Sequence, residues 1–243
     1  MITSKDNEIF KLALKIKDKK YSKSNNLCLV ETFKIINELS LKGLIKNILV
    51  REDKYHLVKD FKNVKIDILS DSLCSKLSDT VTNDGVFAIC KIKNIDKIDY
   101  SKCLILDGIQ DPSNLGAIIC SACAFGYNTI FAINSVYPYS FKCIRSSMGQ
   151  IFNINYIDTT YENLFEIKKN YDITIITADM HGTDVSRLNK DYKNFAIVIG
   201  NEGKGVSDKI SEISDKIVSI PMDNNVESLN ASVSAGILMF ILK

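Results

Sequence analysis

Hydrophobic and polar positions follow two alternating patterns in the first 95 residues. Ile9, Phe10, Ala13 and Leu14 recur at helical spacing, so the first 20 residues are predicted to form a helix. Strands are then predicted at LCLV, LIKNILV, VKIDIL and GVFAICKI, and helices at ETFKIINELSLKG and SDSLCSKLS. This alternation predicts a small α/β domain over residues 1–95. The charged stretch 93–102 lacks periodicity and is predicted to be a linker.

The alternation becomes more regular over residues 101–243. Strands are predicted at CLILDGI, NTIFAI, FNINYI, ITIITA, FAIVIG and KIVSIP. Helices are predicted at Ser113–Phe125, near Phe141–Met148, at YENLFEIKKN and at the final VESLNASVSAGILMFILK. Apolar strands separated by helices indicate a parallel sheet that is covered on both faces. Such sheets bind ligands at the carboxyl ends of their strands, so the residues that follow each strand are the informative ones.

Composition excludes several classes of protein. The 243 residues are 46% hydrophobic and 25% charged, which is ordinary for a folded water-soluble chain. No stretch reaches the roughly 20 apolar residues of a membrane helix, and the N-terminus lacks the apolar segment of a secretory signal. We therefore expect a cytoplasmic protein that contacts no membrane.

The seven cysteines are scattered through mostly apolar runs, as free thiols are in a reducing compartment. Cys120 and Cys123 form a C-x-x-C pair about two turns inside a predicted helix, whereas a redox pair normally lies at the N-terminus of a helix. No second pair completes a zinc site, so we expect no metal. We expect both thiols to be small core residues, and a thiol oxidoreductase is the remote alternative.

Charge is distributed unevenly along the chain. Residues 1–100 carry 19 Lys and Arg against 14 Asp and Glu, a net of +5, and the remaining residues carry 12 against 15, a net of −3. An excess of lysine in one half indicates contact with a polyanion such as RNA. A solvated lysine-rich surface explains the same excess, and charge alone leaves both explanations open.

Three loops that follow predicted strands are rich in Gly, Asn, Ser and acidic residues. GNEGKG at 200–205 is not a phosphate-binding P-loop, because the hydroxyl residue after Lys is missing. Its glycines instead permit close approach of backbone segments. Each polar residue also has a structural explanation: Glu202 as a solvated acid in a turn, and Asn114, Ser228 and Asn230 as helix caps. The functional argument depends on the three loops occurring together.

In combination, the loops resemble the SpoU-type (TrmH-like) RNA ribose 2′-O-methyltransferases of the SPOUT superfamily. LDGIQDPSNLGAII, IVIGNEGKGVSD and IPMDNNVESLNASVSAGI resemble the three motifs of that family, and IRSSMGQIF resembles an intermediate segment. The resemblance implies that residues 101–243 form a SPOUT α/β domain with a parallel sheet and a deep trefoil knot. Residues 1–95 resemble, more loosely, the L30e-like domain that binds the RNA substrate in such enzymes.

The same resemblance implies bound S-adenosylmethionine and a homodimer with its active site at the subunit interface. It assigns cofactor contacts to a set of residues in and around the knot: Gly200, Gly203, Ile220, Met222, Leu229, Thr177 and Ala178. It assigns the polar active-site roles to Asn114, Glu202, Ser228 and Asn230. The protein then needs to align a ribose hydroxyl with the methyl group, assist the loss of its proton and exclude water.

The chain departs from the family at two positions. Cys120 stands where the family has an arginine, and a neutral thiol cannot hold a phosphate as a guanidinium does. Arg145 is our candidate for the missing guanidinium. Thr32, in VETF, stands where relatives usually have a glycine after the glutamate. His181 follows a predicted strand, and we expect it to be a solvated loop residue.

The sequence thus predicts an enzyme that transfers a methyl group from S-adenosylmethionine to a ribose 2′-hydroxyl of RNA. We expect rRNA as the substrate, with tRNA second. The alternative is a catalytically weak or inactive RNA-binding protein on the same fold, because Cys120 replaces the arginine.

Overall fold

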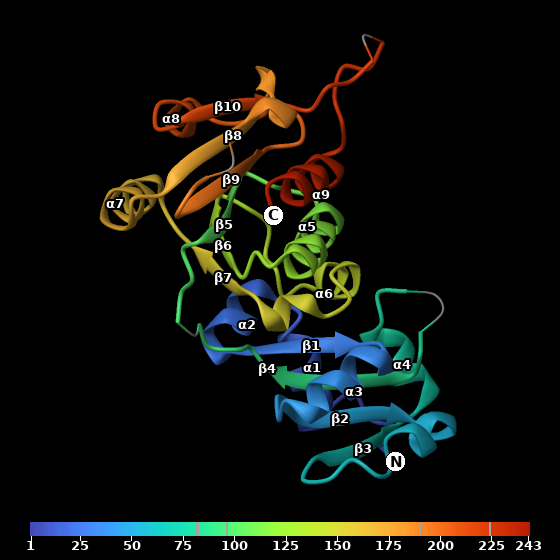
Figure 1. The fold of residues 1–243 in the computed structure, drawn as a ribbon. Coiled ribbons are helices and arrows are strands. Elements are labelled where there is room, and N and C mark those ends of the chain that lie inside the picture. Colours follow the sequence, from blue (N-terminus) through green and yellow to red (C-terminus); the bar gives the residue numbers. More distant parts are fainter. Residues whose placement is uncertain (81–82, 96, 190, 224) are drawn as a thin grey trace. The chain divides into compact units, whose positions relative to one another are not determined.

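The computed structural model describes residues 1–80, 83–95, 97–189, 191–223 and 225–243. The chain divides into two compact units (Figure 1). The N-terminal unit comprises Met1–Asn94 together with Tyr139–Gly149, and the C-terminal unit comprises Ile95–Pro138 with Gln150–Lys243. The predicted domains, 1–95 and 101–243, placed the segment Tyr139–Gly149 in the C-terminal domain, whereas in the structure it belongs to the N-terminal unit. Phe141 packs against the core of the N-terminal unit, which explains why its segment belongs there.

The N-terminal unit is built on a mixed sheet of four strands. Its elements are α1 (Glu8–Lys15), α2 (Lys19–Asn25), β1 (Leu27–Glu31), α3 (Phe33–Leu41), β2 (Ile45–Arg51), the 3-10 helix η1 (Glu52–Leu57), β3 (Lys65–Leu69), α4 (Asp71–Leu77), β4 (Val86–Lys91) and α6 (Phe141–Ser146). The strand order is β1-β4-β2-β3; β4 is antiparallel to both neighbours, and β2 and β3 are parallel. Helices α1 and α4 cover one face, where Phe10, Leu73 and Phe87 are fully or almost fully buried.

The prediction of a single helix over the first 20 residues was wrong. Two helices form, because two side chains each cap a new one. The Asn7 carboxamide oxygen accepts hydrogen bonds from the N–H groups of Ile9 and Phe10, and the Asp18 carboxylate accepts one from Tyr21. Capping satisfies N–H groups that have no partner inside a helix, so each cap fixes a helix start.

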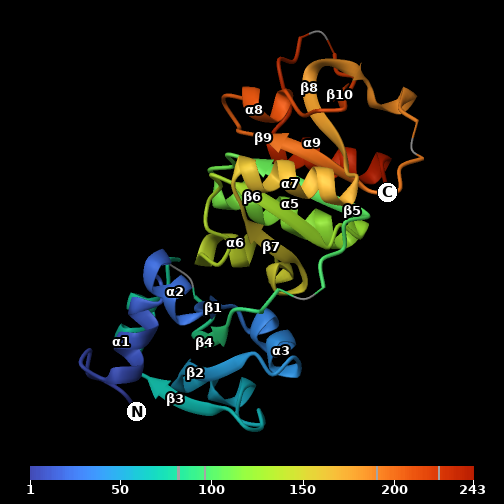
Figure 2. The same cartoon turned by 90° about the vertical axis from the view of Figure 1, so that its left-hand side faces the viewer.

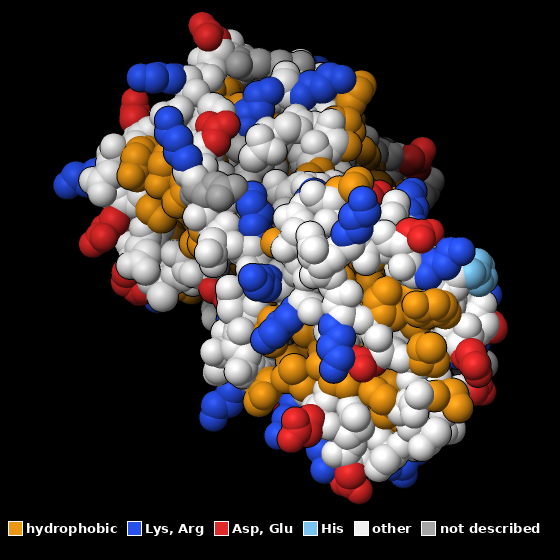
Figure 3. Space-filling model, turned by 90° about the horizontal axis from the view of Figure 1, so that it is seen from below, with side chains coloured by type: hydrophobic (Ala, Val, Ile, Leu, Met, Phe, Trp, Pro, Cys, Tyr) orange, Lys and Arg blue, Asp and Glu red, His pale blue; other side chains and the backbone are white. Residues whose placement is uncertain are grey.

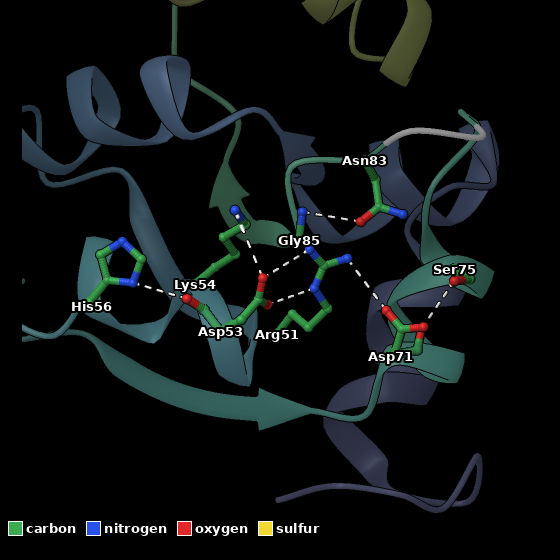
Figure 4. Close-up of polar contacts among 8 residues, drawn as sticks. All are labelled: Arg51, Asp53, Lys54, His56, Asp71, Ser75, Asn83 and Gly85. Carbon is green, nitrogen blue, oxygen red and sulfur yellow. Dashed lines mark hydrogen bonds and ion pairs between the residues drawn. The ribbon is translucent and has the colours of Figure 1, made fainter.

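An arginine joins three segments at the carboxyl ends of β2 and β3 (Figure 4). The Arg51 guanidinium donates to both carboxylate oxygens of Asp53, at 2.7 and 3.1 Å, and to Asp71 at the start of α4, at 3.4 Å. Its backbone N–H donates to the carbonyl of Gly85, which precedes β4, at 2.7 Å. A two-pronged arginine–carboxylate pair is geometrically specific, so this contact fixes the end of the sheet.

Thr32 has a strained backbone between β1 and α3. Its φ of 106° and ψ of 111° lie in a region that a β-branched residue rarely adopts. A glycine would adopt this conformation without strain. The strained backbone of Thr32 is therefore a local source of instability.

The C-terminal unit contains a six-stranded sheet in which every pairing is parallel. Its elements are β5 (Lys102–Asp107), α5 (Pro112–Phe125), β6 (Thr129–Ile133), η2 (Gln150–Asn153), β7 (Asn155–Asp158), α7 (Tyr161–Tyr171), β8 (Thr174–Asp184), η3 (Val185–Arg187), β9 (Phe195–Gly200), α8 (Asp208–Ser211), β10 (Lys216–Ser219) and α9 (Ala231–Ile241). The strand order is β10-β8-β9-β5-β6-β7. The predicted parallel sheet is confirmed. Helices α5 and α9 cover one face and α7 and α8 the other (Figures 1 and 2).

Two elements of this unit differ from the prediction. The final helix was expected to start at Val226 but starts at Ala231, because the Asn230 side chain caps it by accepting from the N–H groups of Ser232 and Val233. Strand β8 was expected to end at Ala178 but continues to Asp184. It resumes pairing with β10 after a bulge, so the bulged residues project away from the regular ladder.

Positive and negative side chains are interspersed on the surface. On the face drawn in Figure 3, lysines and arginines alternate with acidic and exposed hydrophobic side chains. In the described ranges, no helix is both long and apolar enough to cross a membrane.

Candidate active site

The three predicted loops follow the carboxyl ends of β5, β9 and β10; β5 and β9 are adjacent in the sheet, and β8 lies between β9 and β10. One loop leads from β5 to α5, the second from β9 to α8, and the third from β10 to α9. Asn201 joins the first two, because its amide nitrogen donates to the carbonyl of Gly108 at 2.7 Å. Polar residues far apart in the sequence are thus assembled in one place, as expected at this edge of a parallel sheet.

A chain of hydrogen bonds runs through one residue of each loop. The amide nitrogen of Asn230 donates to the amide oxygen of Asn114 at 3.0 Å, and the amide nitrogen of Asn114 donates to the Glu202 carboxylate at 3.0 Å. Three of the predicted polar site residues are therefore in direct contact. Asn114 does not cap its helix; Asp111 does, by accepting from the Ser113 N–H at 2.7 Å.

Glu202 is the acceptor that ends this chain. Besides Asn114, the backbone N–H groups of Gln110 and Asp111 donate to its carboxylate, each at 3.1 Å in the shorter contact. Partial burial opposes its ionisation, but these hydrogen bonds outweigh burial and hold the pKa of Glu202 below its usual value. An ionised, fully engaged carboxylate with a low pKa is a poor general base. Glu202 therefore fixes the position of Asn114.

Two glycines allow the second loop to turn tightly. Asn201 and Gly205 exchange backbone hydrogen bonds of 2.8 and 2.9 Å, and Gly205 has a φ of +70°. A Cβ added to Gly200 would lie 2.3 Å from the carbonyl carbon of Gly205. The glycines predicted to permit close backbone approach do so here, and the turn carries Glu202 at its start.

Two adjoining pockets lie beside this junction. The larger, of about 440 Å³, is lined by the turn at 200–206, the β8 bulge and the segment before α9. The smaller, of about 120 Å³, extends along β10. They share a wall made of Ala178, Asp179, Met180, Glu227, Ser228, Leu229 and Ser234. Both are bounded by backbone and apolar side chains as well as polar groups.

The predicted cofactor residues lie in these pockets with one exception. Gly200 and Gly203 line the larger pocket, Ile220 and Met222 the smaller, and Ala178 and Leu229 both. The exception is Thr177, which is almost fully buried and whose hydroxyl is hydrogen-bonded to that of Ser214. Ser228, predicted as a polar active-site residue, lines both pockets rather than joining the hydrogen-bond chain.

A sequence model of the SpoU rRNA methylase family matches residues 101–240. The chain belongs to this family. Its members are RNA methyltransferases that use S-adenosylmethionine. The match covers all three loops, so the resemblance found in the sequence is confirmed.

Individual relatives agree with the family assignment. The chain is 28% identical to the 23S rRNA (guanosine(2553)-2′-O)-methyltransferase RlmP of Bacillus subtilis, over 100% of this chain and 98% of that protein. It is 32% identical to an uncharacterized tRNA/rRNA methyltransferase of Mycoplasma genitalium, MG252, over 77% of this chain and 78% of the relative.

A solved structure shares the fold. The AdoMet-bound rRNA methyltransferase from Sinorhizobium meliloti superposes with a TM-score of 0.87 at 21% identity, over 99% of this chain and 96% of that one. At 21% identity this likeness concerns the fold alone, and it extends over nearly the whole length of both chains.

Cys120 lies on α5, the helix that begins beside the hydrogen-bond chain. Cys120 and Cys123 are half-buried thiols outside any disulfide, so the prediction that they are core residues was wrong. The other five cysteines are buried, as expected. Within the described residues no cluster of His, Cys, Asp and Glu is arranged to hold a metal ion.

Arg145 lies on α6 and belongs to the N-terminal unit, whereas Asn114, Glu202 and Asn230 belong to the C-terminal unit. Burial raises the pKa of Glu31 at the end of β1, and the nearby charge of Arg145 acts in the opposite direction. Glu31, whose pKa the charge of Arg145 affects, also belongs to the N-terminal unit. Its role in the reaction stays a prediction.

Sequence reasoning missed several residues that shape the site. Gly182 ends the β8 bulge, where an added Cβ would lie 2.5 Å from the backbone of Val218; an isolated glycine near an apolar strand was its signal. His181 was expected in a loop, but it is an exposed residue of the extended β8 that lines the larger pocket. The bulge thus places Asp179 and His181 on the wall of the larger pocket. The predicted strand ended at Ala178, before both of these residues.

Proposed function

We propose that this protein transfers a methyl group from S-adenosylmethionine to a ribose 2′-hydroxyl of RNA. The observation that supports the proposal best is the hydrogen-bonded chain Asn230–Asn114–Glu202, which lies beside a pocket made from the same three loops. It offers a fixed polar surface next to a space for a small molecule. Such preorganisation is what alignment of two reactants requires.

The pocket residues fit the cofactor of the family. The backbone of Gly200 and Gly203 lines the larger pocket, and Leu229 and Met180 add apolar surface. Backbone groups can recognise an adenine, and apolar side chains can cover it. When bound, S-adenosylmethionine supplies a methyl group activated by a sulfonium charge. We assign its binding to Gly200, Gly203, Ile220, Met222, Leu229 and Ala178, with Thr177 acting through its backbone.

Polar side chains would prepare the ribose hydroxyl. Asn114 is held at both ends of its amide, so it can orient a hydroxyl without moving. Glu202 keeps Asn114 in place, and Asn230 both caps α9 and fixes the Asn114 oxygen. Ser228, on the pocket wall, is placed to contact the reacting groups.

We assign substrate recognition to the N-terminal unit and expect rRNA rather than tRNA as the substrate, in the cytoplasm. The relative RlmP, which matches over nearly its whole length, modifies 23S rRNA by name. We also propose the homodimer and the trefoil knot of the family. Val233 and Phe240 of α9 are 48% and 55% exposed, so the face formed by α5 and α9 retains apolar surface that a second copy of the chain would cover.

A non-catalytic RNA-binding protein is the second candidate, and Cys120 is the observation that favours it. A half-buried thiol replaces the cation of the family on the helix that carries Asn114. Arg145 is the proposed substitute for that cation. If Arg145 replaces that cation, Arg145→Ala should lower the rate of methyl transfer. An unchanged rate would show that Arg145 does not take this role.

Methyl transfer from labelled S-adenosylmethionine to unmodified rRNA tests the function directly. Wild type is compared with Cys120→Arg. Label in RNA with wild type establishes catalysis without the family arginine. Label with only the variant identifies a binding protein whose pocket is intact. Label with neither, for rRNA and tRNA alike, refutes the methyltransferase proposal.

A further inference from the structure

A third cavity of the C-terminal unit, of about 550 Å³, opens beside the hydrogen-bonded chain. We call it the Tyr161 pocket, after the tyrosine at the start of α7. The turn from Asn201 to Gly205 forms a wall both of this pocket and of the larger proposed cofactor pocket. Tyr161, Asn134 and Gln110 line only the Tyr161 pocket. Its volume lies in the range typical of small-ligand sites.

Gln110 connects the Tyr161 pocket to the proposed active site. Its backbone N–H donates to Glu202, which holds Asn114. Its side-chain nitrogen donates to the carbonyls of Asn134, at 2.7 Å, and Gly108, at 3.1 Å. A ligand in the pocket would therefore lie one residue away from the groups that align the ribose hydroxyl.

The polar groups of the pocket are held rigidly by a buried carboxylate. Asp107 is 4% exposed and accepts from the Tyr161 hydroxyl at 2.9 Å and from the Ser207 N–H at 2.8 Å. Burial raises the pKa of Tyr161, so the phenol remains neutral. The buried Ser207 hydroxyl also acts on the Tyr161 phenol, in the direction that lowers its pKa, without outweighing burial.

The mouth of the pocket is positively charged. Lys204 is exposed and forms no ion pair in the part of the chain that the structure describes. Lys209 lies over the Tyr161 ring at 4.9 Å and is partly compensated by Glu162 at 3.8 Å. The charge of Asp107 is directed inward to its two donors. An uncompensated ammonium group above neutral hydroxyl and amide groups suits a ligand that is anionic at one end and polar at the other.

We propose that the Tyr161 pocket binds a nucleotide of the RNA strand adjacent to the one that is methylated, with its phosphate at Lys204. This inference rests on the proposed function, since it takes the Asn114 junction as the place of the target ribose. Splayed single-stranded nucleotides are recognised by such combinations of aromatic walls, hydrogen-bonding groups and a cation. The pocket fixes the strand on the side of the turn that the cofactor pocket does not occupy.

The test uses two variants of the full chain. Asn134→Asp adds a negative charge at the mouth without changing side-chain size, and aspartate tolerates the φ of 50° at this position. Lys204→Gln removes the proposed phosphate contact. The matched control is Asn128→Asp, the same exposed substitution at the opposite end of β6. Affinity for in vitro transcribed 23S rRNA is measured against salt, and affinity for S-adenosylmethionine is measured by calorimetry.

We expect each pocket variant to weaken RNA binding about fivefold or more, and Lys204→Gln to lower the slope of log affinity against log salt by about 0.7. Asn128→Asp should match wild type. Asn134→Asp should bind S-adenosylmethionine as wild type does, because Asn134 lines neither cofactor pocket.

Unchanged RNA affinity of Asn134→Asp and Lys204→Gln overturns the proposal. A parallel loss of S-adenosylmethionine affinity in Asn134→Asp also overturns it, since the pocket would then belong to the cofactor site. A wild-type protein that neither binds rRNA nor methylates it refutes the proposed function itself and, with it, this inference.

Discussion

Gly200→Ala should destabilise the C-terminal unit strongly. The new Cβ would lie 2.3 Å from the carbonyl carbon of Gly205 and 2.5 Å from its oxygen, and backbone atoms cannot rotate away. Overpacking of this kind costs about 1–3 kcal/mol. Separating the two segments also breaks the hydrogen bonds of 2.8 and 2.9 Å between Asn201 and Gly205, at about 1 kcal/mol each. The free energy of unfolding should therefore fall by about 3–5 kcal/mol.

Gly203→Ala is the matched control for this substitution. The nearest atom to its Cβ would be a side-chain oxygen of Asn201 at 3.8 Å, an ordinary contact, and its φ is not in the left-handed region. Urea unfolding followed by far-ultraviolet circular dichroism should give a midpoint for Gly200→Ala that is lower by about 1.5–2.5 M, at a typical slope of about 2 kcal/mol per M. Equal midpoints for the two variants would show that Gly200 and Gly205 do not approach as described.

Three further predictions concern other positions. Thr32→Gly should raise the free energy of unfolding by about 1 kcal/mol, measured by thermal denaturation, because release of about 1–3 kcal/mol of strain exceeds the entropy cost of glycine; a lower stability would contradict it. Glu202→Gln should remove a contribution to stability that depends on pH. The pKa of Glu202 is lowered in the folded protein, so the free energy of unfolding of wild type should exceed that of the variant above about pH 4.3. This difference should disappear as the pH falls through the folded-state pKa. A difference independent of pH from 3 to 7 would refute that. Gly182→Ala should weaken S-adenosylmethionine binding at least about tenfold, since a Cβ 2.5 Å from Val218 displaces the bulge; calorimetry showing wild-type affinity would disprove the role of the bulge.

The strands of the C-terminal unit were predictable because hydrophobic runs are local signals. The strands other than β8 are four to six residues long and contain short apolar runs. The end of β8 was not predictable in this way. Residues 179–184 are mostly polar and mostly exposed, and only pairing with β10 after the bulge extends the strand to Asp184.

The site residues were predictable as a group, but their interactions were not. The motifs identified Asn114, Glu202 and Asn230, whereas the order of donors and acceptors among them depends on how three loops meet. Helix caps illustrate the same limit. Asp111 and Asn114 are both plausible caps by residue type; Asp111 caps α5, because the Asn114 side chain bonds to Glu202 and Asn230 instead.

The segment Tyr139–Gly149 makes the two units topologically interdependent. The chain passes from one unit to the other at residues 94–95, 138–139 and 149–150, so no single cut separates them. A fragment that starts at residue 101 would keep α6 but lose the strand β1 that it packs against, leaving buried Cys143 and Ile144 exposed. Such a fragment should aggregate, whereas one that also replaces residues 139–149 with a short polar linker should remain in solution. A chimaera in which the N-terminal unit comes from a relative would likewise have to take both Met1–Asn94 and Tyr139–Gly149 from that relative.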